Sequence, residues 1–126
     1  MTSAPRPLEG VRVVEFSHMV MGPTCGLILA ELGADVVKVE PAPGGDKTRR
    51  LPGSGAGYFG TYNRNKRSIS VNLKSVEGLK FATHLVRESD VLIENFGVGV
   101  LDRLGLGYDA MQEINPSLVY CALKGF

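Results

Sequence analysis

The sequence is short of cysteine and of net charge, and each shortage excludes a class of protein. Cys25 and Cys121 are too few and too far apart along the chain for a metal motif or a disulfide framework, so we interpret both as small core residues. A net charge of +1 over 126 residues leaves no basic excess that would recruit nucleic acid. With 44% hydrophobic residues, the composition is that of an ordinary globular chain.

Long apolar runs are lacking as well. No stretch approaches the roughly 20 apolar residues that a membrane-spanning helix needs. The first ten residues contain proline and glutamate where a signal peptide would be hydrophobic, so we expect a cytoplasmic protein without a membrane partner. A chain of 126 residues is long enough for one domain with a real core, or for part of a larger domain.

The first forty residues predict a β-α-β unit. Residues 11–16 are typical of a strand, and after a turn at 17–22 a helix is predicted to open at Pro23, where a missing N–H costs no helical hydrogen bond. Gly33 is expected to end that helix, and the valine-rich residues 34–40 to form the next strand. The two strands should be parallel, with a right-handed crossover.

A dinucleotide-binding Rossmann module is an alternative interpretation of this unit. Such a module needs Gly-x-Gly-x-x-Gly at the first turn so that the backbone can approach a pyrophosphate. Here the turn holds His18, Met19 and Val20, and the glycine-rich residues 53–57 follow a loop instead of a strand. The missing glycines argue against an NAD or FAD site. A lone histidine such as His18 could orient a ligand but is more often structural.

The remaining residues predict three further strands and the helices between them. Residues 68–73 alternate apolar and polar, as a strand with one buried face does, and Ser75 is a suitable N-cap for an amphipathic helix over 75–88. A strand at 91–93, short helices at 98–104 and 108–114, and a strand at 118–122 follow. The predicted fold class is α/β, with a Rossmann-like parallel sheet flanked by helices.

Between the second and third strands, residues 41–57 are rich in proline and glycine and predict a long surface loop, a place where binding is common. Basic residues gather around this loop. They predict either a local site for phosphate or carboxylate or simply a solvated face. These residues are Lys47, Arg49, Arg50, Arg64, Lys66 and Arg67.

The most informative stretch is residues 90–103. A short apolar strand there leads to Asn95, Phe96 and Gly97, and in open parallel sheets ligands bind in the crevice beyond the strand ends. An amide, a flat apolar ring and a residue without a side chain all suit such a crevice. The alternative is a capped turn with a core phenylalanine.

Several blocks, in order along the chain, resemble the N-terminal region of the class III CoA-transferases (CaiB/BaiF type). They are residues 8–16, Met21-Gly22-Pro23, residues 32–40, residues 65–69, Leu73-Lys74, residues 90–103 and Ile114-Asn115-Pro116. The resemblance covers residues 8–126, the first third of a typical member. It implies that residues 1–126 are the N-terminal part of a CoA-binding large domain, and we expect the chain to be a fragment of a longer protein.

The resemblance also implies transfer of CoA between an acyl-CoA and a small carboxylic acid, in an interlocked homodimer. In the family an aspartate attacks the thioester, which gives a mixed anhydride and releases CoA as a thiolate. The thiolate then attacks the anhydride to give an enzyme–CoA thioester and the free acid, which is covalent catalysis. That aspartate follows the block Lys124-Gly125-Phe126, so we expect no catalytic residue in this chain. The α-methylacyl-CoA racemases share this region and use an acid–base pair instead, so racemisation stays open, as does a non-catalytic interaction role.

Position by position, the resemblance implies a coenzyme A site in which Lys74 and Arg103 are phosphate partners. The implied site consists of Val20, Met21, Val71, Asn72, Leu73, Lys74, Asn95, Phe96, Gly97 and Arg103. Two positions depart from the formyl-CoA transferase members, since Val20 stands in place of a glutamine and Pro41 in place of an arginine. The first departure argues against formyl-CoA and oxalate as substrates. The second removes a phosphate contact that Arg49 or Arg50 could replace.

Overall fold

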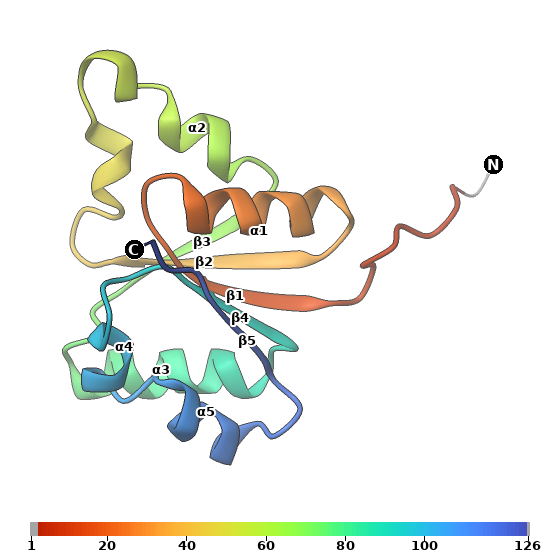
Figure 1. Ribbon diagram of the computed structural model, residues 1–126, viewed down its shortest axis with the longest axis vertical. Helices are drawn as coiled ribbons and strands as arrows, with labels where there is room; N and C mark the ends of the chain where they lie inside the picture. The colour runs from red at the N-terminus through yellow and green to blue at the C-terminus, as the bar shows by residue number, and fades with distance from the viewer. Residues whose placement is uncertain (1–2, 126) are drawn as a thin grey trace.

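The computed structural model describes residues 3–125 and shows a five-stranded parallel sheet between two layers of helices (Figure 1). The strands are β1 Arg12–Phe16, β2 Asp35–Pro41, β3 Arg67–Val71, β4 Val91–Glu94 and β5 Val119–Ala122. Their order across the sheet is β3-β2-β1-β4-β5, and every neighbouring pair is parallel. The predicted α/β class with a Rossmann-like parallel sheet is confirmed.

Helices cover both faces of the sheet. In Figure 1, α1 (Met21–Glu31) and α2 (Tyr58–Asn63) lie on one side of the sheet, while α3 (Val76–Arg87), α4 (Val100–Arg103) and α5 (Tyr108–Ile114) lie on the other. Successive residues of β4 therefore enter different cores. Leu92 packs with residues of α3, α4 and α5, and Ile93 packs with Ala30 of α1. Both side chains are fully buried, as predicted for a strand covered on both faces.

Local sequence signals set several of the element boundaries. The Ser75 hydroxyl accepts the N–H of Gly78 at 3.0 Å and caps α3, as predicted. Gly33 follows the end of α1 with φ +109°, a backbone conformation that favours glycine. The helix predicted at 108–114 is α5, with the same bounds. The helix predicted at 98–104 is the shorter α4.

Three predictions were wrong in detail. α1 begins at Met21 instead of Pro23, because proline is tolerated throughout the first turn of a helix. β3 ends at Val71, and Leu73 reaches the core from the following turn. Residues 41–57 contain short 3-10 helices at Lys47–Arg50 and Gly53–Gly55 and lead into α2, which the sequence pattern did not predict.

Tertiary contacts explain this unpredicted region. The Asp46 side chain accepts the N–H of Thr48 and caps the first 3-10 helix. The Arg49 guanidinium lies 3.8 Å from the centre of the Phe59 ring, which anchors α2 to that helix. The Asp46 cap is local, whereas the contact between Arg49 and Phe59 joins residues that no regular sequence spacing brings together.

Charged side chains are buried in the sheet. Glu15, Lys38, Glu40, Asp46 and Glu94 are each at most 4% exposed, and they lie on β1, β2 and β4 or in the loop after β2. A buried charge is costly unless an opposite charge compensates it. Within residues 3–125, no helix combines the length and the apolar character needed to cross a membrane.

Candidate functional site

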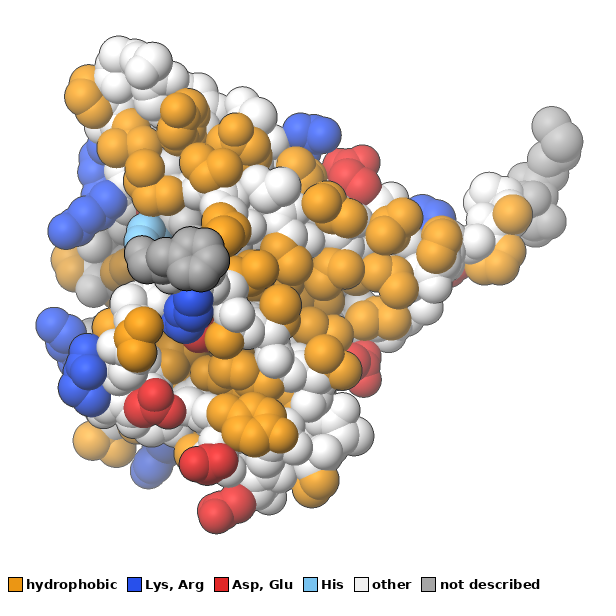
Figure 2. Space-filling view, in the orientation of Figure 1, with side chains coloured by type: hydrophobic (Ala, Val, Ile, Leu, Met, Phe, Trp, Pro, Cys, Tyr) orange, Lys and Arg blue, Asp and Glu red, His pale blue; other side chains and the backbone are white. Residues whose placement is uncertain are grey.

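The candidate site lies at the carboxyl edge of the sheet, where the strand order reverses. β1 and β4 are neighbours, but the chain continues from them toward opposite edges, so their following loops diverge and leave a crevice. Ser17 and His18 follow β1, and Asn95 and Phe96 follow β4. Basic side chains gather on this edge, at the left of Figure 2.

Three neighbouring cavities open at this edge, and Phe96 lines all of them. The first cavity, of about 300 Å³, lies among Val39, Pro41, residues 71–74 and Leu104. The second, of about 360 Å³, is lined by residues 17–19 and by Asp46, Lys47, Thr48 and Leu51. The third, of about 300 Å³, is bordered by Met21, Asn95 and Lys124. Each is in the size range of small-molecule sites.

Most of the residues predicted to contact coenzyme A line these cavities. The first cavity is lined by Val71, Asn72, Leu73, Lys74 and Phe96, and the third by Met21, Asn95, Phe96 and Gly97. Val20 and Arg103 line none of the three. Val20 precedes α1, and Arg103 is exposed on α4 next to Leu104, which lines the first cavity. Contact of these residues with CoA stays a prediction.

The Asn95 side chain joins the two loops at the reversal point. Its Oδ1 accepts the backbone N–H of His18 at 3.0 Å, and its Nδ2 donates to the His18 carbonyl, also at 3.0 Å. The His18 ring lies beside Phe96, with 5.5 Å between the ring centres. The capped-turn alternative therefore describes the Asn95 amide, whereas Phe96 is half-buried and borders the cavities.

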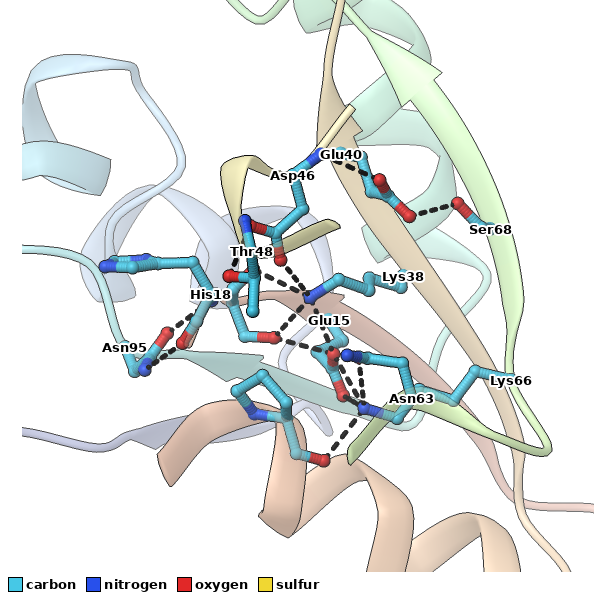
Figure 3. Close-up of polar contacts among 12 residues, drawn as sticks. Glu15, His18, Lys38, Glu40, Asp46, Thr48, Asn63, Lys66, Ser68 and Asn95 are labelled. Carbon is cyan, nitrogen blue, oxygen red and sulfur yellow. Dashed lines mark hydrogen bonds and ion pairs between the residues drawn. The ribbon is translucent and has the colours of Figure 1, made fainter. Parts of the chain in front are cut away.

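A network of buried charges lies behind the crevice (Figure 3). Lys38 Nζ lies 3.5 Å from Glu15 Oε2 and 3.2 Å from Asp46 Oδ2, and Lys66 Nζ lies 3.0 Å from Glu15 Oε1. Glu15 Oε1 and Asp46 Oδ2 accept no hydrogen bond within residues 3–125, so the ammonium groups alone compensate them. Because the two lysines balance the two carboxylates, the network is neutral overall. Burial lowers the pKa of Lys66, and Glu15 opposes that shift.

The buried Glu40 carboxylate forms a second ion pair beside the network, with the exposed side chain of Arg49. Its carboxylate accepts two hydrogen bonds from Arg49, each 2.7 Å long, and one of 2.6 Å from the Ser68 hydroxyl. Burial by itself would raise the pKa of Glu40, but the hydrogen bonds from Arg49, from the Asp46 N–H and from Ser68 lower it to about 2. The carboxylate is therefore ionised near neutral pH.

The structure pairs most of the basic residues around residues 41–57 with carboxylates. Arg49 pairs with Glu40, Arg64 with Glu31, Lys66 with Glu15 and Arg67 with Asp35. These pairings favour the solvated-face alternative over a shared anion site. Replacement of the lost phosphate contact by Arg49 or Arg50 stays a prediction. Arg50 donates to the Gly44 carbonyl, and Lys47 lines the second cavity.

The cysteines have the core role predicted for them. Cys25 of α1 and Cys121 of β5 are half-buried and pack on the same apolar cluster. Burial, with Cys121 beside it, raises the pKa of the Cys25 thiol to about 11, so this thiol is protonated near neutral pH and is a poor nucleophile. In the described part of the chain, no group of three or more His, Cys, Asp or Glu side chains could hold a metal ion.

Sequence reasoning missed the buried network of Glu15, Lys38, Asp46 and Lys66. A signal was present, because Glu15 and Lys38 each interrupt a valine-rich strand that was predicted to be parallel. In a strand covered on both faces, such a charge has to be buried and therefore paired. The register that places Glu15 opposite Lys38 is visible only in the assembled sheet.

An open parallel sheet with a crevice at the reversal of its strand order places the chain in the α/β class, in which ligands generally bind at such a crevice. The family model of CoA-transferase family III matches residues 8–126, and the chain belongs to this family. It is 50% identical over 125 residues to a formyl-CoA:oxalate CoA-transferase of Streptomyces coelicolor, covering 96% of this chain and 30% of that protein. The corresponding protein of Rhodopseudomonas palustris strain HaA2 is 47% identical, and the match covers 96% of this chain and 29% of that protein.

Solved structures share the fold. A CaiB/BaiF family protein from Brucella suis superimposes with a TM-score of 0.89 at 44% identity, covering 98% of this chain and 34% of the other. An orthorhombic form of Rv3272 from Mycobacterium tuberculosis gives a TM-score of 0.91 at 39% identity, covering 96% and 34%. The chain spans about 30% of the length of the curated relatives it matches.

Proposed function

We propose that this chain is the CoA-binding N-terminal part of a cytoplasmic enzyme that transfers CoA from an acyl-CoA to a carboxylic acid. The observation that carries the proposal is the crevice around Phe96, at the strand-order reversal of a chain that belongs to CoA-transferase family III. The relatives' names, formyl-CoA:oxalate CoA-transferase, support a CoA thioester as one substrate.

The chemistry of the cavities suits the parts of coenzyme A. The first cavity has apolar walls, among them Val71, Leu73 and Phe96, which can pack against an adenine ring or a pantetheine arm. Lys74 lines the same cavity and carries the positive charge that a phosphate requires. α1 begins at Met21 and Gly22, and no side chain at its N-cap accepts a hydrogen bond from the first backbone N–H groups. The positive end of the helix dipole therefore favours an anion nearby.

Calorimetric titration with CoA tests the proposal in the protein expressed from its complete coding sequence. We expect saturable binding that Phe96→Ala weakens without changing which acid accepts CoA, because the ring borders all three cavities. The matched control is Phe81→Ala, on the outer face of α3, which should leave CoA affinity unchanged. Unchanged affinity in a folded Phe96→Ala protein would rule out this site.

The proposed reaction runs through an aspartyl-CoA thioester, and we propose that none of the aspartates in this chain forms it. Asp35 pairs with Arg67 at the start of β2, and Asp90 accepts the backbone N–H of Arg12 at the start of β1, both at the edge opposite the crevice. Asn substitutions of Asp35, Asp90 and Asp102 should each leave the covalent acyl or CoA adduct intact in mass spectra. Loss of the adduct in any folded variant would overturn this assignment.

The acyl donor and the acceptor need a separate experiment. Val20 precedes α1. The formyl-CoA transferases that this chain resembles carry a glutamine at this position. We therefore expect poor exchange with formyl-CoA and oxalate, and faster exchange with a larger or less polar acid. A panel of acyl-CoA and acid pairs, followed by chromatography of the CoA esters, tests this expectation. Inversion of an α-methylacyl-CoA without exchange of its acid would support the racemase alternative instead.

We also propose that the complete protein is an interlocked homodimer, as the family resemblance implies. Size-exclusion chromatography of the full-length protein with light scattering measures its mass. A monomeric mass at micromolar concentration would contradict the proposal.

A further inference from the structure

The turn after β1 contains a residue in an unfavourable backbone conformation. Met19 has φ +61°, in the left-handed region, where the Cβ of an L-residue crowds the backbone. Such conformations persist only when the surrounding structure enforces them, and they cluster at functional sites. Met19 lines the second cavity, next to His18 and across from Thr48.

Thr48 enforces this conformation through its hydroxyl group. The Thr48 Oγ1 atom lies 3.0 Å from the Met19 amide nitrogen and accepts its N–H. A hydroxyl has a single proton, and Thr48 donates its proton to Asp46 Oδ1 at 2.8 Å. The carboxylate thereby orients the hydroxyl so that an oxygen lone pair is free for Met19.

Lys38 closes the chain of contacts at its other end. Its ammonium lies 3.2 Å from Asp46 Oδ2, and it donates to the carbonyl of Ser17 at 2.8 Å and to the Ser17 hydroxyl at 3.0 Å. The contacts therefore run from Met19 to Thr48 and on through Asp46 and Lys38 back to the same turn. Figure 3 shows Thr48, Asp46 and Lys38 side by side. Lys38, Asp46 and Thr48 are at most 2% exposed, so water does not compete for these contacts.

We propose that Lys38, Asp46 and Thr48 are positioning residues that hold residues 17–19 in the left-handed turn and so preform the wall of the second cavity for an acyl-CoA. The proposal rests on the proposed function, because CoA affinity is one of its measurements. Without the three side chains, Met19 relaxes to an ordinary backbone conformation. Acyl-CoA then binds only those molecules in which Met19 has the left-handed conformation. The apparent affinity for acyl-CoA is reduced in proportion to the fraction of such molecules.

Thr48 offers a matched pair of variants. Thr48→Val removes the hydroxyl at nearly constant volume, whereas Thr48→Ser keeps it. In the full-length protein, we expect Thr48→Val to raise the Kd for CoA about tenfold, the size of effect that follows loss of one buried hydrogen bond. The Met19 amide should exchange its hydrogen faster in the ligand-free Thr48→Val protein, and Thr48→Ser should restore both values.

Thr83→Val is the control for loss of a threonine hydroxyl far from the crevice. The Thr83 hydroxyl donates to the Leu79 carbonyl within α3, so its loss should change neither CoA affinity nor exchange at Met19. A folded Thr48→Val protein with normal CoA affinity and normal Met19 exchange would overturn the proposal.

Met19→Gly separates positioning from general destabilisation. Glycine adopts φ +61° without crowding, so the turn needs less support from Thr48. We expect Thr48→Val to weaken CoA binding less in a Met19→Gly background than in the unaltered protein. An equal loss in both backgrounds would overturn the proposal, because the defect would then not act through the turn.

The two proposals fail in different ways. If the unaltered protein does not bind CoA, the proposed function fails, while Met19 amide exchange in Thr48→Val and Thr48→Ser still decides the positioning role. If Thr48→Val does not fold, Thr48→Ala also removes the hydroxyl that accepts the Met19 N–H. A Met19 amide exchange rate in Thr48→Ala equal to that in Thr48→Ser would then reject the role.

Discussion

Arg103 is an exposed cation on α4, one residue before Leu104 of the first cavity. Its guanidinium reaches back toward Gly99, at the start of α4. If it contacts a phosphate of CoA, Arg103→Ala removes a charge-assisted hydrogen bond worth roughly 1.5–3 kcal/mol. We therefore expect the Kd for CoA to rise about ten- to a hundredfold. Turnover at saturation should fall less than kcat/KM, because the contact is remote from the thioester.

The control for Arg103→Ala is Arg87→Ala. Arg87 is an exposed cation at the end of α3, just before β4 begins at the opposite edge of the sheet. Arg87→Ala should leave CoA affinity unchanged. Comparison of the two variants therefore separates a specific contact from the loss of one positive charge. Unchanged CoA affinity in a folded Arg103→Ala protein would remove Arg103 from the site.

Glu40 should make stability depend on pH in the acid range. Its pKa is about 2, against an ordinary value of 4.5, because hydrogen bonds from Arg49 and its neighbours outweigh the effect of burial. A carboxylate whose pKa is lowered on folding stabilises the protein above its ordinary pKa, and this contribution is lost as the pH falls toward the folded-state value. We expect the free energy of unfolding to decline from pH 4.5 to about 2 through this group.

Urea unfolding at a series of pH values measures this contribution. Glu40→Gln should lower stability near neutral pH, since it leaves Arg49 without its partner, and should flatten the decline in acid. Glu113→Gln, at an exposed carboxylate of α5, changes the net charge equally and should keep the decline. A Glu40→Gln protein with the unaltered acid profile would refute the assignment.

Two glycines let α1 approach the end of β1 closely. A Cβ at Gly22 would lie 2.7 Å from the Ser17 Cβ and 2.7 Å from the Asn95 Cγ, which is too close for any real contact. A Cβ at Gly26 would overlap Glu15 Oε1 and press on Lys66 Nζ. α1 can therefore cover the buried ion pairs only where it carries no side chain.

Gly26→Ala should destabilise the fold even though alanine is the better helix former. Overpacking of a rigid, buried carboxylate costs about 1–3 kcal/mol, which exceeds the gain in helix propensity. Gly60→Ala is the matched control, because Gly60 lies in α2 with nothing within 4 Å of an added Cβ. That change should be neutral or stabilise by about 0.5–1 kcal/mol. Thermal unfolding of both variants tests the contrast, and equal melting temperatures would contradict it.

The whole molecule has an open side at β5. Among the described residues β5 pairs with β4 alone, and the side chain of Val119 is 61% exposed. Figure 2 shows apolar side chains across the middle of this face. An edge strand with apolar side chains is normally covered by another element or another chain.

We expect a protein of the relatives' full length to bind CoA, and residues 1–126 alone to bind it weakly or not at all. The chain spans about 30% of the curated relatives, so parts of the pocket would be missing from the isolated piece. Calorimetric titration of the two proteins side by side measures the difference. Tight binding of CoA by residues 1–126 alone would show that the crevice described above is sufficient.

Local patterns in the sequence determined which segments form the five strands and most of the helices, with α2 and the two 3-10 helices as the exceptions. Valine-rich runs, the Ser75 cap and Gly33 act over a few residues, so they can be read without knowing the fold. The order of alternating strands and helices then predicts a parallel sheet, and a parallel sheet predicts a crevice near Asn95 and Phe96. These inferences require only chain connectivity and the short-range physics of backbone and side chains.

The tertiary structure alone decided which polar groups meet at the crevice. Thr48 meets Met19 across 29 positions of sequence, and Asn95 meets His18 across 77. Arg49 and Lys66 read as surface cations in the sequence, yet they pair with buried Glu40 and Glu15. The partner of a buried charge depends on strand register and loop path, because these set the atoms within reach when water is excluded. No local pattern encodes that geometry.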